Sequence, residues 1–207
     1  RYHVLKGEVE LPYSKRKVTT WSMFTNNEAK LWKKSIEYLN DAVYYYSLWN
    51  GDYPYNQMTA VDGTISAGGG MEYPNVTVIG ESKAGFLLEQ VIMHETGHNW
   101  YYGILGSNER QHPWMDEGLN TFHERRYMTL KYPRAHLAGD FESSALEFFN
   151  IDEHAYRDLY AMSYTTSARR DFDQPIGLPA TDYTTANYGL IVYHKTGVVF
   201  DYLRAYL

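Results

Sequence analysis

A run of eight residues, Met93-His94-Glu95-Thr96-Gly97-His98-Asn99-Trp100, constrains this chain more than any other feature. His94 and His98 are four residues apart, so on a helix both imidazoles lie on one face and can reach a single Zn²⁺ at roughly 2.0–2.1 Å. Glu95 lies about 100° round the same helix. It is near enough to act on a water at the metal without being a ligand. The run therefore predicts a helix that carries a metal site.

A third ligand is predicted in the run Trp114-Met115-Asp116-Glu117-Gly118. Eighteen residues separate His98 from Glu117, an interval used by zinc peptidases whose third ligand is glutamate. Three protein ligands leave the fourth position open to water, which is typical of catalytic zinc rather than structural zinc. We therefore expect His94, His98 and Glu117 to bind one zinc ion per chain.

The run allows three other interpretations. A different third-ligand pattern requires glycine and histidine three and six residues after the second histidine, where this chain has Tyr101 and Ile104. A pair of core histidines without metal is a second possibility. A structural zinc is a third, but it leaves Glu95 as an unexplained carboxylate beside the ion.

Composition excludes several classes of protein. The net charge is −6 and no block of like charge appears, so a nucleic-acid partner is not expected. The chain has no cysteine, so metal ligands must be His, Asp or Glu. No stretch approaches the roughly 18 apolar residues of a membrane span. The expected compartment is the cytoplasm or periplasm of a bacterium.

The hydrophobic pattern favours an α+β fold in one domain, with strands first and helices after. Residues 1–20 read as loosely extended, and two strands at 56–61 and 75–79 read as a pair joined through a glycine-rich turn. Helices are predicted at 27–49, 85–102 (with Ser82 as N-cap), 115–130, 141–149 and 197–207, and a long irregular loop at 164–187.

Glu124 lies two turns after Glu117 on the same predicted helix face. Carboxylates in such positions often orient metal-bound histidines. The alternative is a surface glutamate that pairs with Arg125 or Arg126. Six further histidines have no partner at ligand spacing, and most of them are interpreted as surface or loop residues; they are His3, His112, His123, His136, His154 and His194.

Four motifs together resemble the aminopeptidase N family of zinc metallopeptidases, a gluzincin family that includes leukotriene hydrolase. They are the His94–His98 run, the Glu117 run, Gly69-Gly70-Met71-Glu72-Tyr73 and Tyr193-His194-Lys195. Their order and spacing match over roughly residues 68–200. Thermolysin is a poorer match, because its relatives have an aspartate four residues after the glutamate ligand, where this chain has Thr121.

The resemblance implies a thermolysin-like catalytic domain over residues 1–207, with a small mixed sheet, an edge strand lining the cleft, and a mainly helical part after it. Members of the family carry a β-rich domain before this unit, of which residues 1–20 are a candidate tail, and a helical domain after it. The chain begins at Arg1 without a methionine and ends within a helical pattern. We therefore expect a chain that normally packs against neighbouring domains.

The resemblance also implies roles for individual residues. Glu72 would bind the free α-ammonium of a peptide, and Gly69, Gly70 and Met71 would line the strand against which the peptide pairs. Tyr193 would stabilise the oxyanion. The family usually has Asn where Tyr73 stands, which leaves the preference for the first substrate residue open.

These features predict a zinc-dependent aminopeptidase that hydrolyses the N-terminal bond of peptides with a free N-terminus, with Glu95 as the general base. Two rivals remain open. One is a catalytically silent, peptide-binding pseudoenzyme, and the other is an epoxide hydrolase of the same family.

Overall fold

The computed structural model describes residues 2–65, 69–133 and 154–207. They form two compact units, Arg1–Gly106 (unit 1) and Ser107–Leu207 (unit 2). The helix predicted at 141–149 lies outside the described residues. Each unit is described in turn.

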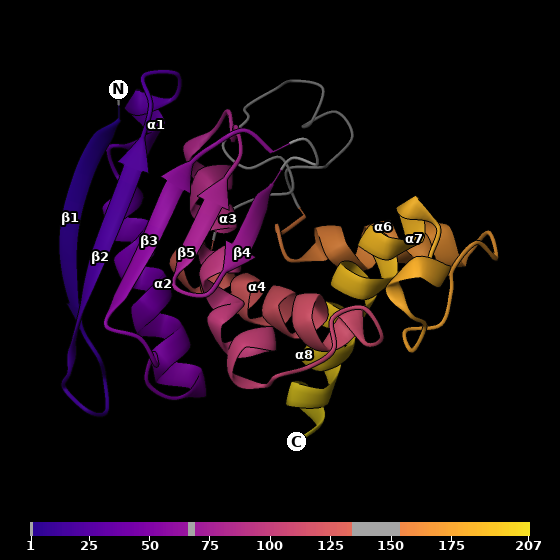
Figure 1. Ribbon diagram of the computed structural model, residues 1–207. Helices are drawn as coiled ribbons and strands as arrows, with labels where there is room; N and C mark the ends of the chain where they lie inside the picture. Colours follow the sequence, from indigo (N-terminus) through magenta and orange to yellow (C-terminus); the bar gives the residue numbers. More distant parts are fainter. Residues whose placement is uncertain (1, 66–68, 134–153) are drawn as a thin grey trace. The chain divides into compact units, whose positions relative to one another are not determined.

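Unit 1 contains a five-stranded mixed sheet with the strand order β1-β2-β3-β5-β4 (Figure 1). Its strands are β1 (His3–Glu10), β2 (Lys17–Phe24), β3 (Gln57–Asp62), β4 (Gly70–Tyr73) and β5 (Val76–Ile79). The pairs β1–β2 and β4–β5 are antiparallel, whereas β2–β3 and β3–β5 are parallel. The strand that carries Glu72, β4, lies at the edge of the sheet. The α+β class and the small mixed sheet are as predicted.

Two details of the sheet differ from the sequence-based prediction. The strands predicted at 56–61 and 75–79 are neighbours, but they are parallel and no simple turn joins them. Parallel neighbours need a crossover, and here the chain first forms β4, which then pairs back on β5 through a two-residue turn at Pro74 and Asn75. Asn75 has φ +56, a left-handed conformation that asparagine tolerates. Residues 3–20, a candidate tail of another domain, contribute to β1 and β2 of this sheet.

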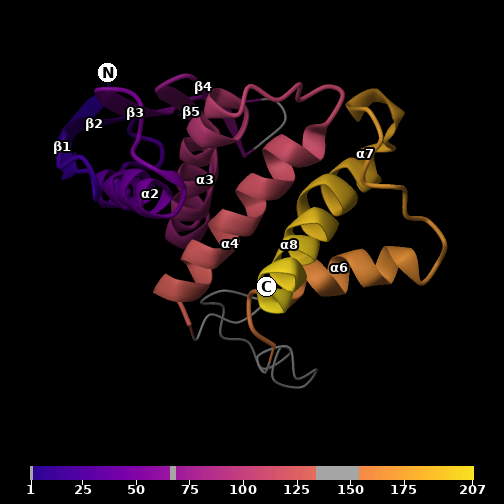
Figure 2. The ribbon, with the colours of Figure 1, turned by 90° about the horizontal axis from the view of Figure 1, so that it is seen from below.

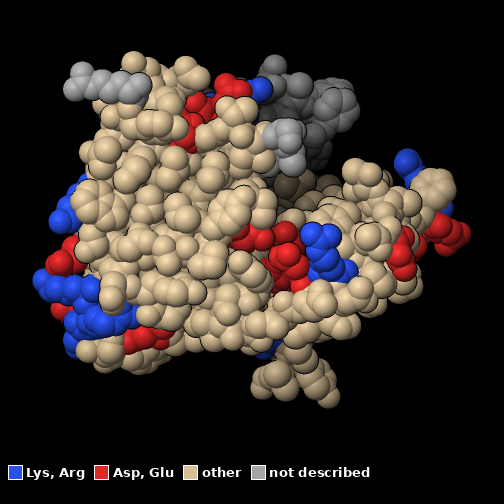
Figure 3. All heavy atoms as spheres, in the orientation of Figure 1, with Lys and Arg blue, Asp and Glu red and all other residues tan. Residues whose placement is uncertain are grey.

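Two helices, α2 (Ser35–Asn50) and α3 (Gly85–Gly97), cover the same face of the sheet, as Figure 2 shows. Burial alternates along β2, β3 and β5, as the period of two in a strand requires. The covered face and the two helices form an apolar core; among its buried side chains are Leu39, Val43, Met58, Ala60, Ile79, Leu88 and Ile92. The opposite face is drawn in Figure 3 and is mostly uncharged over its middle.

The N-terminus of α3 differs from the sequence-based prediction. Ser82 is not its N-cap, because Ala84 occupies that position in an extended conformation. Ser82 instead donates its backbone N–H to the Glu28 carboxylate at 3.0 Å, and Lys83 does the same at 2.7 Å. Glu28 precedes a short helix, α1 (Ala29–Trp32), so the predicted helix at 27–49 is two helices, α1 and α2. The α-helix α3 ends at Gly97, and the π-helix η1 (Asn99–Ile104) follows.

Unit 2 is helical in its described part. Its helices are η2 (Trp114–Gly118), α4 (Leu119–Lys131), α6 (Asp158–Ala168), η4 (Ala180–Asp182), α7 (Thr185–Asn187), η5 (Tyr188–Lys195) and α8 (Thr196–Tyr206). The helix predicted at 115–130 thus corresponds to η2 and α4, and the helix predicted at 197–207 to α8. The predicted loop at 164–187 begins later than expected, because α6 extends to Ala168. Throughout the described ranges, no helix is both long enough and apolar enough to cross a membrane.

Candidate metal centre

The helix α3 presents the two predicted histidine ligands together. The rings of His94 and His98 are 4.9 Å apart between centroids and nearly perpendicular to each other. His98 is buried, with 1% of its surface exposed, and His94 is half-buried. Leu88 and Ile92 of the same helix are fully buried, so their packing in the core fixes the helix that carries both imidazoles. The local geometry is the one that the four-residue spacing predicts.

The edge strand β4 brings a carboxylate to this helix. Glu72, Glu95 and His98 each offer one ligand atom, and these atoms all lie within 4.8 Å of one another. Glu72 is paired opposite Thr77, which is fully buried, so its side chain belongs to the sheet face that α3 covers. Glu95 is 6% exposed. Unit 1 therefore holds two carboxylates and an imidazole in one cluster, where the edge strand β4 meets the helix α3.

Gly70 lies directly against the Glu95 side chain. A β-carbon built at Gly70 would overlap the Cγ atom and the carboxyl group of Glu95, so only glycine leaves this carboxylate in place. Gly69 has φ +71, which also favours glycine. Met71, by contrast, is 39% exposed and follows the alternation onto the other sheet face. The side chain of Met71 thus lies away from the cluster, and only its backbone can line the strand edge on this side.

Asn99 is a structural residue of this site to which sequence reasoning assigned no role. Its side chain is buried, accepts a hydrogen bond from the backbone N–H of Asn75 at 3.0 Å, and donates to the Thr96 carbonyl at 2.9 Å. The Tyr53 hydroxyl donates to the same Asn99 oxygen at 3.4 Å. Because Asn75 lies in the turn between β4 and β5, Asn99 fixes the hairpin that carries Glu72 to the end of the histidine helix.

In unit 2, Glu117 is half-buried in the π-helix η2. The next residue, Gly118, is in close contact with the helices η5 and α8. A β-carbon at Gly118 would overlap the Thr196 side chain and lie 2.7 Å from the Val192 carbonyl oxygen. Glycine after Glu117 therefore permits η2 to pack closely on η5, the segment that contains Tyr193.

Glu124 is 4% exposed, so the alternative of a surface glutamate is wrong. Its carboxylate accepts a hydrogen bond from the Tyr160 hydroxyl at 3.1 Å. Burial and the nearby carboxylate raise the pKa of Tyr160 well above its usual value, which keeps the hydroxyl a donor. The neighbouring Arg125 forms an ion pair with Asp201 at 2.9 Å.

Tyr193 is half-buried in η5, with its ring 5.9 Å from that of Tyr188. Its neighbour His194 is hydrogen-bonded to Ser163 at 2.6 Å, and burial lowers the pKa of His194. His123 is 8% exposed, and burial, aided by Arg126, lowers its pKa to about 3. His123 is therefore not among the surface or loop histidines, and His194 is half-buried in η5.

The donor set suits zinc. Imidazole nitrogens and carboxylate oxygens are ligands that Zn²⁺ accepts, and the chain has no thiolate to offer. Unit 1 provides both imidazoles, at the spacing a shared ion requires, with carboxylates beside one of them. Glu117 belongs to unit 2 and remains a predicted ligand.

Comparisons with known proteins show which solved structures have a similar fold. No family model matches the chain, and no curated protein matches it either. Among solved structures, the chain is similar to an M1 zinc metallopeptidase from Deinococcus radiodurans, with 14% identity and a TM-score of 0.64 over 100% of this chain and 41% of that one. A mutant M1 metallopeptidase from Deinococcus radiodurans described with a Tyr-Ser-Ala substrate matches with 14% identity and a TM-score of 0.60, over 98% and 40% of the two chains.

A third solved structure is described as a two-domain M1 zinc metallopeptidase mutant bound to L-tryptophan. It matches with 15% identity and a TM-score of 0.63, over 99% of this chain and 40% of that one. The chain thus spans about two fifths of the length of these structures. At such low identity the likeness concerns the fold, and the chain has the fold of part of an M1 zinc metallopeptidase.

Proposed function

We propose that this chain is the catalytic part of a zinc-dependent aminopeptidase. The observation that carries the proposal is the cluster of Glu72, Glu95 and His98, in which a strand at the sheet edge and the histidine helix meet. The likeness in fold to M1 zinc metallopeptidases supports it. The substrates are peptides with a free N-terminus, and the chain acts together with further domains of a longer protein.

His94, His98 and Glu117 would hold the zinc ion. When bound there, Zn²⁺ supplies a Lewis acid that polarises the scissile carbonyl and makes water a better nucleophile near neutral pH. The two histidines lie on α3 beside each other. Glu124, buried and hydrogen-bonded to Tyr160, would help to orient the ligands.

Glu95 acts as the general base. It takes a proton from the attacking water as the water oxygen bonds to the scissile carbon, and it delivers that proton to the leaving amine as the C–N bond breaks. Glu72 binds the α-ammonium of the substrate, which limits cleavage to the first residue. Tyr193 donates its hydroxyl to the oxyanion. The open edge of β4 pairs with the peptide backbone as an added strand would.

Metal analysis tests the ligand assignment. We expect about one zinc ion per chain, and Glu117→Ala should lose zinc to a chelator that the unchanged protein resists. The exposed Glu81 is a suitable control, since Glu81→Ala removes the same group from unit 1 outside the proposed site. Undiminished zinc retention in Glu117→Ala would show that Glu117 is not a ligand.

Gly70→Ala tests the position of the general base. The added methyl group would displace the Glu95 carboxylate, because the two cannot occupy the same space. We expect kcat to fall about tenfold while zinc content stays the same, since a small misplacement of a reacting group is costly. Gly85→Ala, at the start of α3 in the same unit, is the matched control, because a β-carbon there meets only the Tyr38 hydroxyl, at 3.8 Å. An unchanged kcat in Gly70→Ala would contradict the assignment of Glu95.

A further inference from the structure

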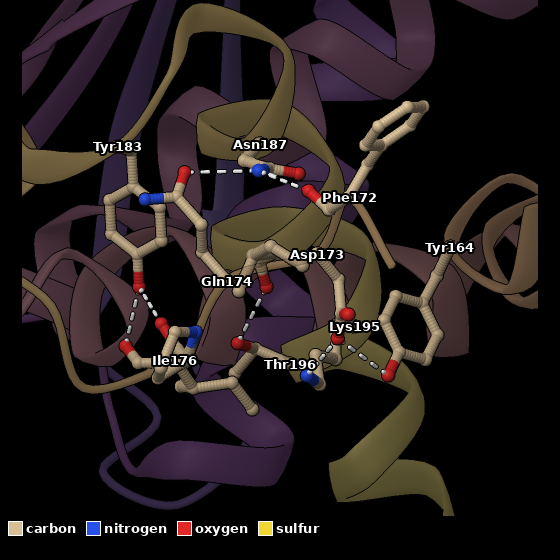
Figure 4. A network of polar contacts seen from close by, with 11 residues as sticks. Tyr164, Phe172, Asp173, Gln174, Ile176, Tyr183, Asn187, Lys195 and Thr196 are labelled. Carbon is tan, nitrogen blue, oxygen red and sulfur yellow. Dashed lines mark hydrogen bonds and ion pairs between the residues drawn. The ribbon is translucent and has the colours of Figure 1, made fainter. Parts of the chain in front are cut away.

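The segment between α6 and α7 is held in one conformation by its own polar side chains (Figure 4). Gln174 accepts hydrogen bonds from the Thr184 backbone at 2.9 Å and from the Asn187 side chain at 3.0 Å. The same glutamine donates to the Asp182 carbonyl at 2.9 Å. The Gln174 amide therefore links the two ends of residues 174–184, which are the greater part of a loop formed by residues 172–184, and gives this loop a defined shape.

The loop is also fastened to the helices on either side of it. Asn187 donates to the Phe172 carbonyl at 2.7 Å, and Lys195 pairs with Asp173 at 3.1 Å. Lys195 also lies 4.9 Å from the ring centroid of Tyr164 on α6. The hydrogen bond from Lys195 lowers the pKa of Asp173, so the pair is charged at neutral pH. The start of the loop is therefore bound to the last residue of η5.

A row of three tyrosine rings runs from this loop to the candidate oxyanion donor. The Tyr183 hydroxyl donates to the carbonyls of Pro175 and Ile176, both at 2.7 Å. The Tyr183 ring lies 6.1 Å from the Tyr188 ring, which lies 5.9 Å from the Tyr193 ring, in edge-to-face arrangements. Such contacts fix the mutual orientation of rings. The loop thus supports Tyr193 from one side.

We propose that residues 172–184 form a positioning loop for Tyr193, with Asp173 and Tyr188 as positioning residues. Tyr193 lies between the two attachments, five residues after Tyr188 and two before Lys195. The intervening segment is a π-helix, a rare conformation that often marks functional sites. An oxyanion donor must lie about 2.7–3.1 Å from the oxyanion that it stabilises. The attachments on both sides of Tyr193 would therefore hold its hydroxyl at that distance. This inference rests on the proposed aminopeptidase function.

A double-mutant cycle in the full-length, zinc-loaded protein tests the proposal. Tyr193→Phe should lower kcat about 10²–10³-fold, as loss of an oxyanion donor does. Asp173→Asn removes the charge but little volume, and should lower kcat about tenfold with KM nearly unchanged. Because Asp173 acts through Tyr193, the double variant should be no slower than Tyr193→Phe alone. Glu8→Gln breaks the exposed ion pair with Lys17 and should leave kcat unchanged.

Multiplicative effects of the two substitutions would overturn the proposal, because they would show that Asp173 acts without Tyr193. A wild-type kcat in Asp173→Asn would overturn it too. If Asp173→Asn fails to fold, Tyr188→Leu provides the same cycle by removing the ring contact. An unchanged kcat in Tyr193→Phe would overturn both this proposal and the role of Tyr193 in the proposed function, which distinguishes that failure from a failure of the loop alone.

Discussion

Glu95→Gln is expected to lower kcat by about 10²–10⁴-fold while zinc content and substrate affinity stay near those of the unchanged protein. Glutamine has the same shape as glutamate, so it fits the space that Gly70 leaves open beside residue 95. Its amide cannot take the proton of the attacking water. The measurement is steady-state hydrolysis of aminoacyl amides at matched zinc occupancy.

Glu37→Gln is the control, since Glu37 is exposed on α2 in the same unit. Near-normal turnover in Glu95→Gln would exclude the role of base. Loss of zinc from this variant would instead identify Glu95 as a ligand. Zinc content is therefore measured in the same variant, because Glu95 lies close to His98. If the unchanged, zinc-loaded protein binds peptides but never cleaves them, the pseudoenzyme alternative would replace the aminopeptidase.

The sequence predicted the parts of the site that depend on local geometry. The spacing of His94 and His98 is enough to place both rings on one helix face, and the structure has the rings 4.9 Å apart. Glu72 was different, because nothing in its own surroundings distinguishes it from other strand glutamates. Only the resemblance singled it out, and the structure adds its closeness to Glu95 and His98.

The parts that could not be predicted depend on contacts between distant segments. Asn99 binds Asn75 and Tyr53, which are 24 and 46 residues away, so its own neighbourhood carries no sign of its role. His123 is buried and His194 half-buried by the packing of helices within unit 2, which the spacing of histidines along the sequence does not reveal.

The relative direction of neighbouring strands could not be predicted from the hydrophobic pattern either. Hydrophobic alternation predicted strands near β3 and β5, but alternation is the same for parallel and antiparallel neighbours. The direction depends on where β4 pairs. The same pairing makes β4 an edge strand with Glu72 on the α3 side.

Acetylation of the substrate α-amine is expected to lower kcat/KM about 100-fold, since hydrogen bonds to charged groups contribute roughly 1.5–3 kcal/mol and the Glu72 carboxylate would lose its cationic partner. The measurement compares free and N-acetylated aminoacyl amides with the same side chain. Glu72→Gln should bring the two kcat/KM values closer together, because it slows cleavage of the free substrate far more than cleavage of the acetylated one. The control Glu37→Gln should leave the ratio of the two kcat/KM values unchanged.

The reasoning depends on where Glu72 lies. Its carboxylate is within 4.8 Å of ligand atoms of Glu95 and His98, so a substrate whose ammonium meets Glu72 has its first peptide bond near the base and the histidine helix. A blocked amine cannot make that contact, and nothing then favours the first bond over later ones. Comparable rates for free and acetylated substrates would therefore assign this chain to the endopeptidases, with Glu72 left as a carboxylate that serves the cluster rather than the substrate terminus.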